Sequence, residues 1–291
     1  KAIDNMSSAG IRTVLVPTIV KGINDHQVGD IAKFAIENTE KISGISWQPV
    51  AFTGRIDYKK RLAQRFTLAD LTRTIQDQSG YADMYRDWYP FGFVDPFSRL
   101  LEETNGPGQT KLGCSPTCGV ATYMVVDPQT REVTPLPAFV DVEPMMQTLS
   151  DTADQLKNKR FFRKLTLAQN LKSLKKHFHQ EKAPRNWTFD TLADFMMDFA
   201  DFKQRYTDNT TRRQLVEEKP YRVLLMASMH FQDVYNYQLD RVGRCVIHYA
   251  APDGKIYPFC TYNSGPCHRS RIESEHSISL EEYRKQLRQS K

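Results

Sequence analysis

Ile11-Arg-Thr-Val-Leu-Val16 is a short, largely apolar run rich in β-branched residues. It follows a segment with helical character, Lys1 to Ala9, that Gly10 ends. A run of this length and composition, bounded by turn residues, predicts a buried strand of a parallel sheet. The next segment, Lys21 to Gln27, contains Gly and Asn and is expected to be the loop that leaves this strand.

The pattern then alternates between helix and strand. Apolar positions at helical spacing predict a helix that begins at Val28 and ends at Asn38, and Ile42 to Phe52 supplies a second strand. A third segment, Thr67 to Gln78, starts with a capping-box-like pair because Asp70 follows Thr67 by three residues, and Gly80 follows its end. This β-α-β-α order is typical of α/β folds, either a barrel or an open doubly wound sheet.

In such folds ligands bind at the carboxyl ends of the strands. Those ends correspond to Pro17–Asn24 and Gln48–Arg55, which carry the polar and Gly residues that a ligand site needs. Two strands cannot close a barrel, so we expect the earlier strands to lie upstream of Lys1 and this chain to be a carboxy-terminal portion of a longer protein.

From Tyr81 the sequence becomes rich in aromatic and turn residues, and these aromatics are expected to form core or to line an apolar substrate channel. Val120 to Asp127 is a predicted strand, and residues 142–217 are predicted to be largely helical. Near the end, Cys245 to Tyr249 and Lys255 to Cys260 flank a turn and predict a hairpin. We therefore divide the chain into residues 1–80 and a second, α+β region, 81–291, with a helical insertion.

The bulk composition is that of an ordinary globular protein, with 291 residues, 40% hydrophobic and 25% charged. The net charge of +6 favours anionic partners, although its basic helix faces lack any groove-reading motif and nucleic-acid binding is not expected. No run approaches the ~20 apolar residues of a membrane span, and no secretion signal opens the chain. A cytosolic location is expected, with peripheral membrane contact left open.

Five cysteines, all after residue 113, are the main candidates for chemistry. Cys118, Cys245 and Cys260 come from three separate segments that end in turns or strands, so their thiolates could converge on an iron-sulfur cluster or zinc. Cys114 and Cys267 are weaker candidates that could supply a fourth ligand. The absence of any CxxC pair disfavours zinc, and buried or incidental thiols are the structural alternative.

Two histidines are further candidates. His230 and His248 could serve as ligands or as acid/base groups, but lone histidines near aromatics are more often satisfied core residues.

Several blocks of sequence resemble the radical S-adenosylmethionine (SAM) branch that includes archaeal tetraether lipid synthase and its bacterial relatives, some of them pterin methylase-like. The blocks occur in the family's order and together span nearly the whole sequence. They are Leu15-Val-Pro-Thr-Ile-Val-Lys-Gly-Ile-Asn-Asp-His-Gln27, Trp47-Gln-Pro-Val-Ala-Phe-Thr-Gly-Arg55, Cys118-Gly-Val-Ala-Thr-Tyr123, and Arg244-Cys-Val-Ile-His-Tyr-Ala with Pro258-Phe-Cys-Thr-Tyr-Asn263.

The resemblance implies that residues 1–80 are the last strands of a partial (β/α)6 barrel, which binds SAM and a 4Fe-4S cluster. It implies C–C coupling of lipids or methylation, in either case at an unactivated carbon, with a small-molecule or lipid substrate and an electron donor such as ferredoxin or flavodoxin. The cysteines would hold an auxiliary cluster. The residues expected to flank SAM are Val16, Pro17, Thr18, Gln48, Pro49 and Val50.

This sequence departs from the family at one point. Cys114 and Cys118 form a CxxxC pair, but the third position of a CxxxCxxC motif would be Ala121, so the pair is not the radical-generating motif. We therefore expect a fragment that is inactive alone or a degenerate relative. A non-catalytic module that holds zinc or iron for structure is the alternative hypothesis.

Overall fold

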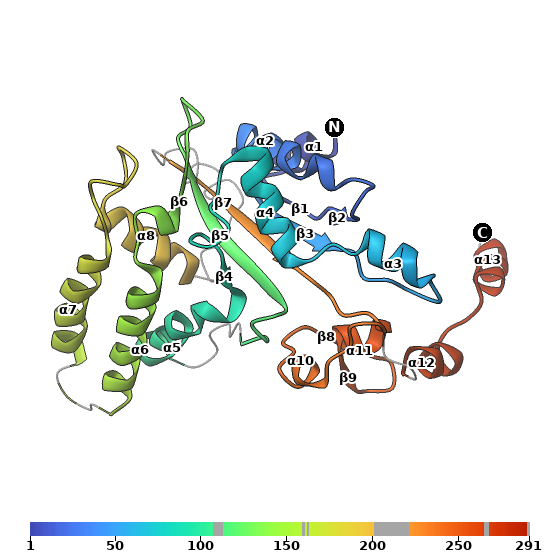
Figure 1. Cartoon of the computed structure of the whole chain (residues 1–291). Coiled ribbons are helices and arrows are strands. Elements are labelled where there is room, and N and C mark those ends of the chain that lie inside the picture. The colour runs from blue at the N-terminus through green and yellow to red at the C-terminus, as the bar shows by residue number, and fades with distance from the viewer. Residues whose placement is uncertain (107–112, 159–160, 162, 201–220, 265–267, 290–291) are drawn as a thin grey trace.

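The computed structural model describes residues 1–106, 113–158, 161, 163–200, 221–264 and 268–289. A mixed sheet runs through the larger part of the molecule, and helices pack on both of its faces (Figure 1). A smaller unit of short helices and a two-stranded hairpin lies beyond one end of the sheet (Figure 1). The strands are β1 Thr13–Leu15, β2 Thr18–Ile19, β3 Ile42–Pro49, β4 Tyr89–Pro90, β5 Gly119–Val126, β6 Val133–Pro135, β7 Arg222–Met229, β8 His248–Ala250 and β9 Ile256–Pro258.

The order β1-β3-β7-β5-β4 defines the main sheet, with β2 paired to β3 and β6 paired to β5. Strands β1, β3 and β7 are parallel, whereas β5 is antiparallel to β7, β4 and β6. The expected α/β class and the parallel pairing of the first two strands are confirmed. The sheet is mixed rather than purely parallel, and the partial barrel stays a prediction.

The helices are α1 Ala2–Ser8, α2 Val28–Glu37, α3 Tyr58–Gln64, α4 Leu68–Ser79, α5 Asp95–Asn105, α6 Val142–Asn158, α7 Arg163–Leu174, α8 Phe189–Ala200, α10 Leu239–Gly243, α11 Phe259–Ser264, α12 His268–His276 and α13 Leu280–Gln289. Within the described residues, none is both long and apolar enough to cross a bilayer.

Local sequence signals explain the first helices well. Thr67 and Asp70 form the predicted capping box at the start of α4, and Gly80 ends the helix with a φ of 67° that favours glycine. The predicted strand over residues 11–16 is confirmed but shorter, as β1, and a second short strand, β2, follows it after Val16 and Pro17. Pro17 has no N–H to donate to a ladder, although its carbonyl accepts from Gln48 N at 2.9 Å.

Two apolar cores lie on opposite faces of the sheet. On one face, Ile45 and Trp47 of β3 pack with Leu224 and Met226 of β7 beneath α2 and α4. On the other face, Val125 of β5 packs with side chains of α6 and α8. The segment predicted to be largely helical contains α6, α7 and α8, its residues 201–217 lie outside the described residues, and its being an insertion stays a prediction. Strands from both sides of the predicted boundary at residue 80 share one sheet, and the division into two domains stays a prediction.

The carboxy-terminal unit contains the predicted hairpin, with His248 paired to Pro258 and Ala250 paired to Ile256. Its strands are shorter than expected. Cys245 precedes β8, and Cys260 lies in α11 rather than on the return strand, because the backbone turns into a helix directly after Pro258.

Candidate cofactor and substrate site

The segments expected to flank SAM lie side by side at the carboxyl ends of parallel strands. Thr18 is in register with Gln48, and Ile19 with Pro49. Val50 N donates to Ile19 O at 3.0 Å, which continues the pairing past the end of β3. The structure therefore brings Val16–Thr18 and Gln48–Val50 together, and their role in binding SAM stays a prediction.

A buried ion pair joins this edge to the segment that follows β7. Asp233 is fully buried and accepts from Arg65 Nη1 at 2.7 Å and from Phe52 N at 2.9 Å. Burial alone would raise the pKa of Asp233, but the Arg65 hydrogen bond and the backbone donors of Phe52 and Tyr235 outweigh it, so the pKa is lowered. This carboxylate holds the loop after β3 against the loop after β7.

The segment after β7 also reaches the cysteines. His230 N donates to Cys118 O at 2.9 Å, and Gln232 N donates to Cys260 Sγ at 3.3 Å. Cys118 stands immediately before β5, so the ends of β5 and β7 and helix α11 meet at this point. Backbone N–H groups of the segment after β7 thus hold both cysteines, Cys118 through its carbonyl and Cys260 through its sulfur.

Cys114 and Cys245 lie in the same neighbourhood. Burial raises the pKa of the Cys114 thiol, the nearby Cys118 and Cys245 thiols raise it further, and Arg241 lowers it. Burial likewise raises the pKa of Cys260, with Gln232 N–H and Arg241 lowering it and Cys245 and Cys118 raising it. The direct contacts are those of Cys118 and Cys260 with the segment that follows β7, and Cys114 and Cys245 lie within electrostatic range of them. Cys267, the fifth candidate, lies outside the described residues.

A buried cation stands among the thiols. Arg241 is 7% exposed, and its Nε donates to Cys118 Sγ at 3.4 Å while its Nη2 donates to His230 O. A buried guanidinium is costly unless anionic partners surround it. Arg241 therefore places a permanent positive charge beside Cys118, where it could balance an anionic group bound at this point.

Within the part of the chain that the structure describes, no group of three or more Cys, His, Asp or Glu side chains could hold one metal ion. A 4Fe-4S cluster takes four Cys thiolates as ligands. Cys114, Cys118, Cys245 and Cys260 supply the donor type and number for a cluster.

His230 is mostly buried beside this group, and its Nε2 has no hydrogen-bond partner among the described residues. Burial, with the nearby Arg65 and Arg241, lowers the pKa of His230 to about 4, against a smaller opposing effect of Asp233. The side chain is therefore neutral at neutral pH. His248, the other candidate, is exposed on β8.

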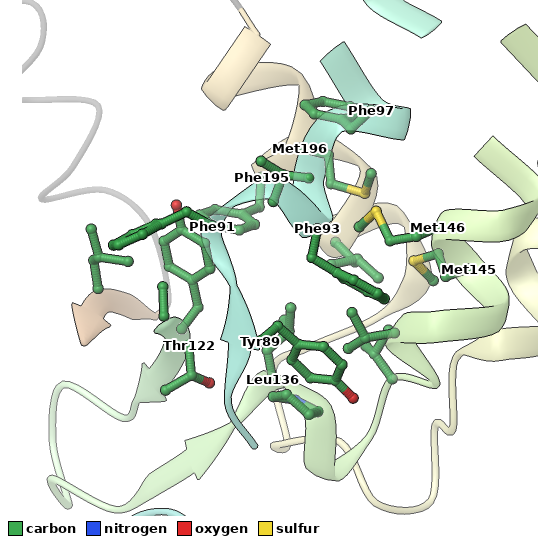
Figure 2. Close-up of a pocket in the computed structure, with 18 of the residues that line it drawn as sticks. Tyr89, Phe91, Phe93, Phe97, Thr122, Leu136, Met145, Met146, Phe195 and Met196 are labelled. Carbon is green, nitrogen blue, oxygen red and sulfur yellow. The ribbon is translucent and has the colours of Figure 1, made fainter. Parts of the chain in front are cut away.

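An apolar cavity of about 250 Å³ lies on the sheet face opposite α2 and α4. Figure 2 shows aromatic and methionine side chains turned toward one another around it. Ala121 and Tyr123 of β5 and Leu225 of β7 form its floor. The remaining walls include Tyr89, Phe91, Phe93, Phe97, Leu136, Met145, Met146, Leu192, Phe195 and Met196. Tyr89, Phe91, Phe93 and Phe97 thus line an apolar space, whereas Trp88 belongs to the core, and a role of this space as a substrate channel stays a prediction.

The cavity and the predicted SAM edge share one face of the sheet. Leu225 is in register with Gly44, and a Cβ on Gly44 would meet Leu225 Cβ at 3.0 Å. Because side chains alternate along a strand, Ser46 and Gln48 lie on the face of Gly44. Gln48 therefore projects from the face that carries the cavity.

Sequence reasoning missed Arg65, Asp233 and Arg241. Each acts through a contact with a residue more than 100 positions away, so local spacing carries no signal for them. The sequence signal that could have pointed to Asp233 is its position three residues after His230, a candidate ligand.

Comparison with known proteins places this site in context. No protein-family model matches the sequence. The chain is 34% identical over 286 residues to a 7,8-dihydro-6-hydroxymethylpterin dimethyltransferase of Methanocaldococcus jannaschii, an alignment that covers 98% of this chain and 54% of the relative. It is 31% identical over 108 residues to a GTP 3′,8-cyclase of Pseudomonas fluorescens, covering 33% of this chain and 32% of that protein. The chain thus spans about half the length of the first relative. The expected likeness to a pterin methylase-like protein is confirmed.

Proposed function

We propose that this chain is the carboxy-terminal portion of a radical SAM iron-sulfur enzyme that functionalises an unactivated carbon. The observation that carries the proposal is that Cys118 Sγ meets the buried Arg241 and Cys260 Sγ meets Gln232 N, both beside the end of β7. The sequence blocks around Cys118, Cys245 and Cys260, and the similarity to a pterin dimethyltransferase, support it.

In that family, SAM and a 4Fe-4S cluster supply a carbon-centred radical that abstracts hydrogen from the substrate. This chain's own residues would hold the auxiliary cluster and shape the substrate site. Cys118, Cys245 and Cys260 are the proposed ligands, and Cys114 is the proposed fourth because its thiol lies within the same group. Arg241 balances their charge, and the Arg65–Asp233 pair holds the loop after β3 in place.

The cavity favours an apolar substrate. Its walls are almost wholly hydrocarbon, aromatic or thioether, whereas a pterin ring needs several hydrogen-bond donors and acceptors. An aliphatic substrate would bury its surface there without leaving polar groups unpaired. We therefore propose chemistry on a lipid, either methylation or the coupling of two carbons. The name of the first relative makes a pterin the second candidate substrate.

The test is anaerobic purification of the full-length protein, followed by iron and sulfide analysis and incubation with SAM and dithionite. The proposal expects 5′-deoxyadenosine and at least one cluster beyond the radical-generating one. A protein that binds iron and sulfide at neither site and cleaves no SAM would contradict the proposal.

A zinc or iron module that serves structure only is the alternative. Metal analysis of this chain separates the two: stoichiometric, colourless zinc favours the structural module, and a brown, oxygen-sensitive chromophore favours the cluster. The four described cysteines match the four thiolates that a 4Fe-4S cluster takes, which supports the cluster.

A further inference from the structure

A basic surface follows β3. We use this name for the loop and helix α3 between residues 53 and 65, in which five Arg or Lys residues stand against one acidic residue, a net charge of +4 in a protein of net charge +6. Arg55, Lys59 and Lys60 are exposed and Arg61 is half-exposed. None of these four side chains forms an ion pair with another residue that the structure describes, so their charge is available to a partner.

The basic surface is fixed in shape. Tyr235 Oη donates to Gly54 O at 3.0 Å and accepts from Ile56 N at 3.1 Å, which holds the loop to the segment after β7. The Arg61 guanidinium lies 4.0 Å from the centre of the Tyr235 ring. Asp57 caps α3 by accepting from Lys60 N. A partner would meet a preformed surface, which lowers the entropy cost of binding.

A short route connects this surface to the cysteines. Arg65, at its end, pairs with Asp233 at 2.7 Å. The preceding residue, Gln232, donates its N–H to Cys260 Sγ at 3.3 Å. One ion pair, two consecutive residues and one hydrogen bond thus connect the basic surface to the proposed cluster site.

We propose that the basic surface is the docking site of an acidic protein that carries a low-potential one-electron centre. This inference rests on the proposed function. Complementary charge would steer such a partner, and its centre would come to rest near the cysteines. Each encounter would pass one electron from the reduced partner to the oxidised iron-sulfur centre that the cysteines would hold, with no bond made or broken.

The apolar side chains on the surface favour a protein partner over a phosphate-bearing small molecule. Tyr58 and Leu62 are 61% and 57% exposed between the charges. Exposed aromatic and aliphatic groups framed by Arg and Lys are typical of protein interfaces, whereas a phosphate site needs converging donors in a pocket.

The test titrates an acidic flavodoxin, in its oxidised form, onto the protein by calorimetry. The variant is Lys59→Glu/Lys60→Glu, and the matched control is Lys175→Glu/Lys176→Glu, a pair of exposed neighbouring lysines directly after α7. We expect Kd to rise at least about tenfold in the variant and less than about twofold in the control. Binding of the unmodified protein should also weaken between about 50 mM and about 300 mM salt.

Equal affinity of variant and control for flavodoxin would overturn the proposal. The proposal would also be overturned if flavodoxin does not bind and phosphatidylglycerol vesicles or RNA bind instead, with an affinity that Lys59→Glu/Lys60→Glu lowers. Dithionite-driven SAM cleavage, which needs no protein donor, tests the proposed function separately. Lysine-dependent flavodoxin binding without that cleavage would leave the docking surface standing and refute the radical chemistry.

Discussion

Arg241 donates from Nε to Cys118 Sγ at 3.4 Å inside a group of thiols, and the same guanidinium fixes the carbonyl of His230 at the end of β7. Its burial places a permanent positive charge next to the sulfurs. A cation in this position stabilises electron-rich thiolate ligands and the reduced form of any centre they bind.

Arg241→Gln removes that charge while keeping hydrogen-bonding capacity. We expect the reduction potential of the reconstituted centre to fall by about 60 mV or more, a tenfold change in a one-electron equilibrium. A redox titration followed by electron paramagnetic resonance measures it. The exposed neighbour Arg244 offers the control Arg244→Gln, and equal potentials in the two variants would show that Arg241 acts only as a packing residue.

Asp233→Asn tests the buried pair with Arg65. Removing one partner of a buried ion pair leaves the other uncompensated, so we expect the free energy of unfolding to fall by about 3 kcal/mol. Urea unfolding measures the loss. Asp77→Asn, at an exposed position of α4, should change it by less than about 0.5 kcal/mol.

The same pair predicts a pH dependence. The pKa of Asp233 is lowered in the folded protein, so its contribution is fully present above the ordinary Asp pKa of about 3.9 and is lost as the pH falls through the folded value. The stability difference between the unmodified protein and Asp233→Asn should therefore be constant from pH 7 to about pH 5 and shrink below about pH 4. A difference that grew on acidification would contradict this assignment.

Filling the cavity should block an apolar ligand. Ala121→Phe projects a ring from the floor of the cavity, and we expect a fluorescent fatty acid to bind at least about tenfold more weakly. The exposed alanine of α3 gives the control Ala63→Phe, which should leave binding unchanged. If the fatty acid does not bind, and a pterin binds with an affinity that Ala121→Phe lowers, the pterin rather than the lipid is the substrate.

Gly119 should not tolerate a side chain. A Cβ there would stand 2.3 Å from the Phe91 ring and 2.5 Å from Ser228 O, directly after Cys118. We expect Gly119→Ala to lower the free energy of unfolding by about 1–3 kcal/mol and to displace Phe91 from the cavity wall. Gly113→Ala, with nothing within 4 Å of its Cβ, is the matched control, and equal losses would show that the contact at Gly119 is not the cause.

Local signals predicted the first part of the fold because each one acts over a few residues. The capping pair Thr67 and Asp70 and the left-handed Gly80 define α4 without help from distant contacts. The antiparallel place of β5 beside β7 depends instead on pairing across about 100 residues, such as Thr122 with Met226, which no periodicity encodes. The helical setting of Cys260 was missed for a related reason, since six residues are too few to show a helical pattern.

The candidate site shows the same division. The cysteines and the strand ends were found because residue type and turn position suffice to nominate them. Arg241 is an unremarkable basic residue in the sequence, and only the fold buries it against Cys118.

Anaerobic reconstitution of this chain with iron and sulfide tests the central claim most directly. We predict about four iron and four sulfide per protein molecule, with a brown absorbance. Cys118→Ala, Cys245→Ala and Cys260→Ala should each lose this absorbance. Of Cys114→Ala and Cys267→Ala, the variant that also loses it identifies the fourth ligand. Unchanged spectra in Cys118→Ala, Cys245→Ala and Cys260→Ala, or a protein that takes up no sulfide, would contradict the account.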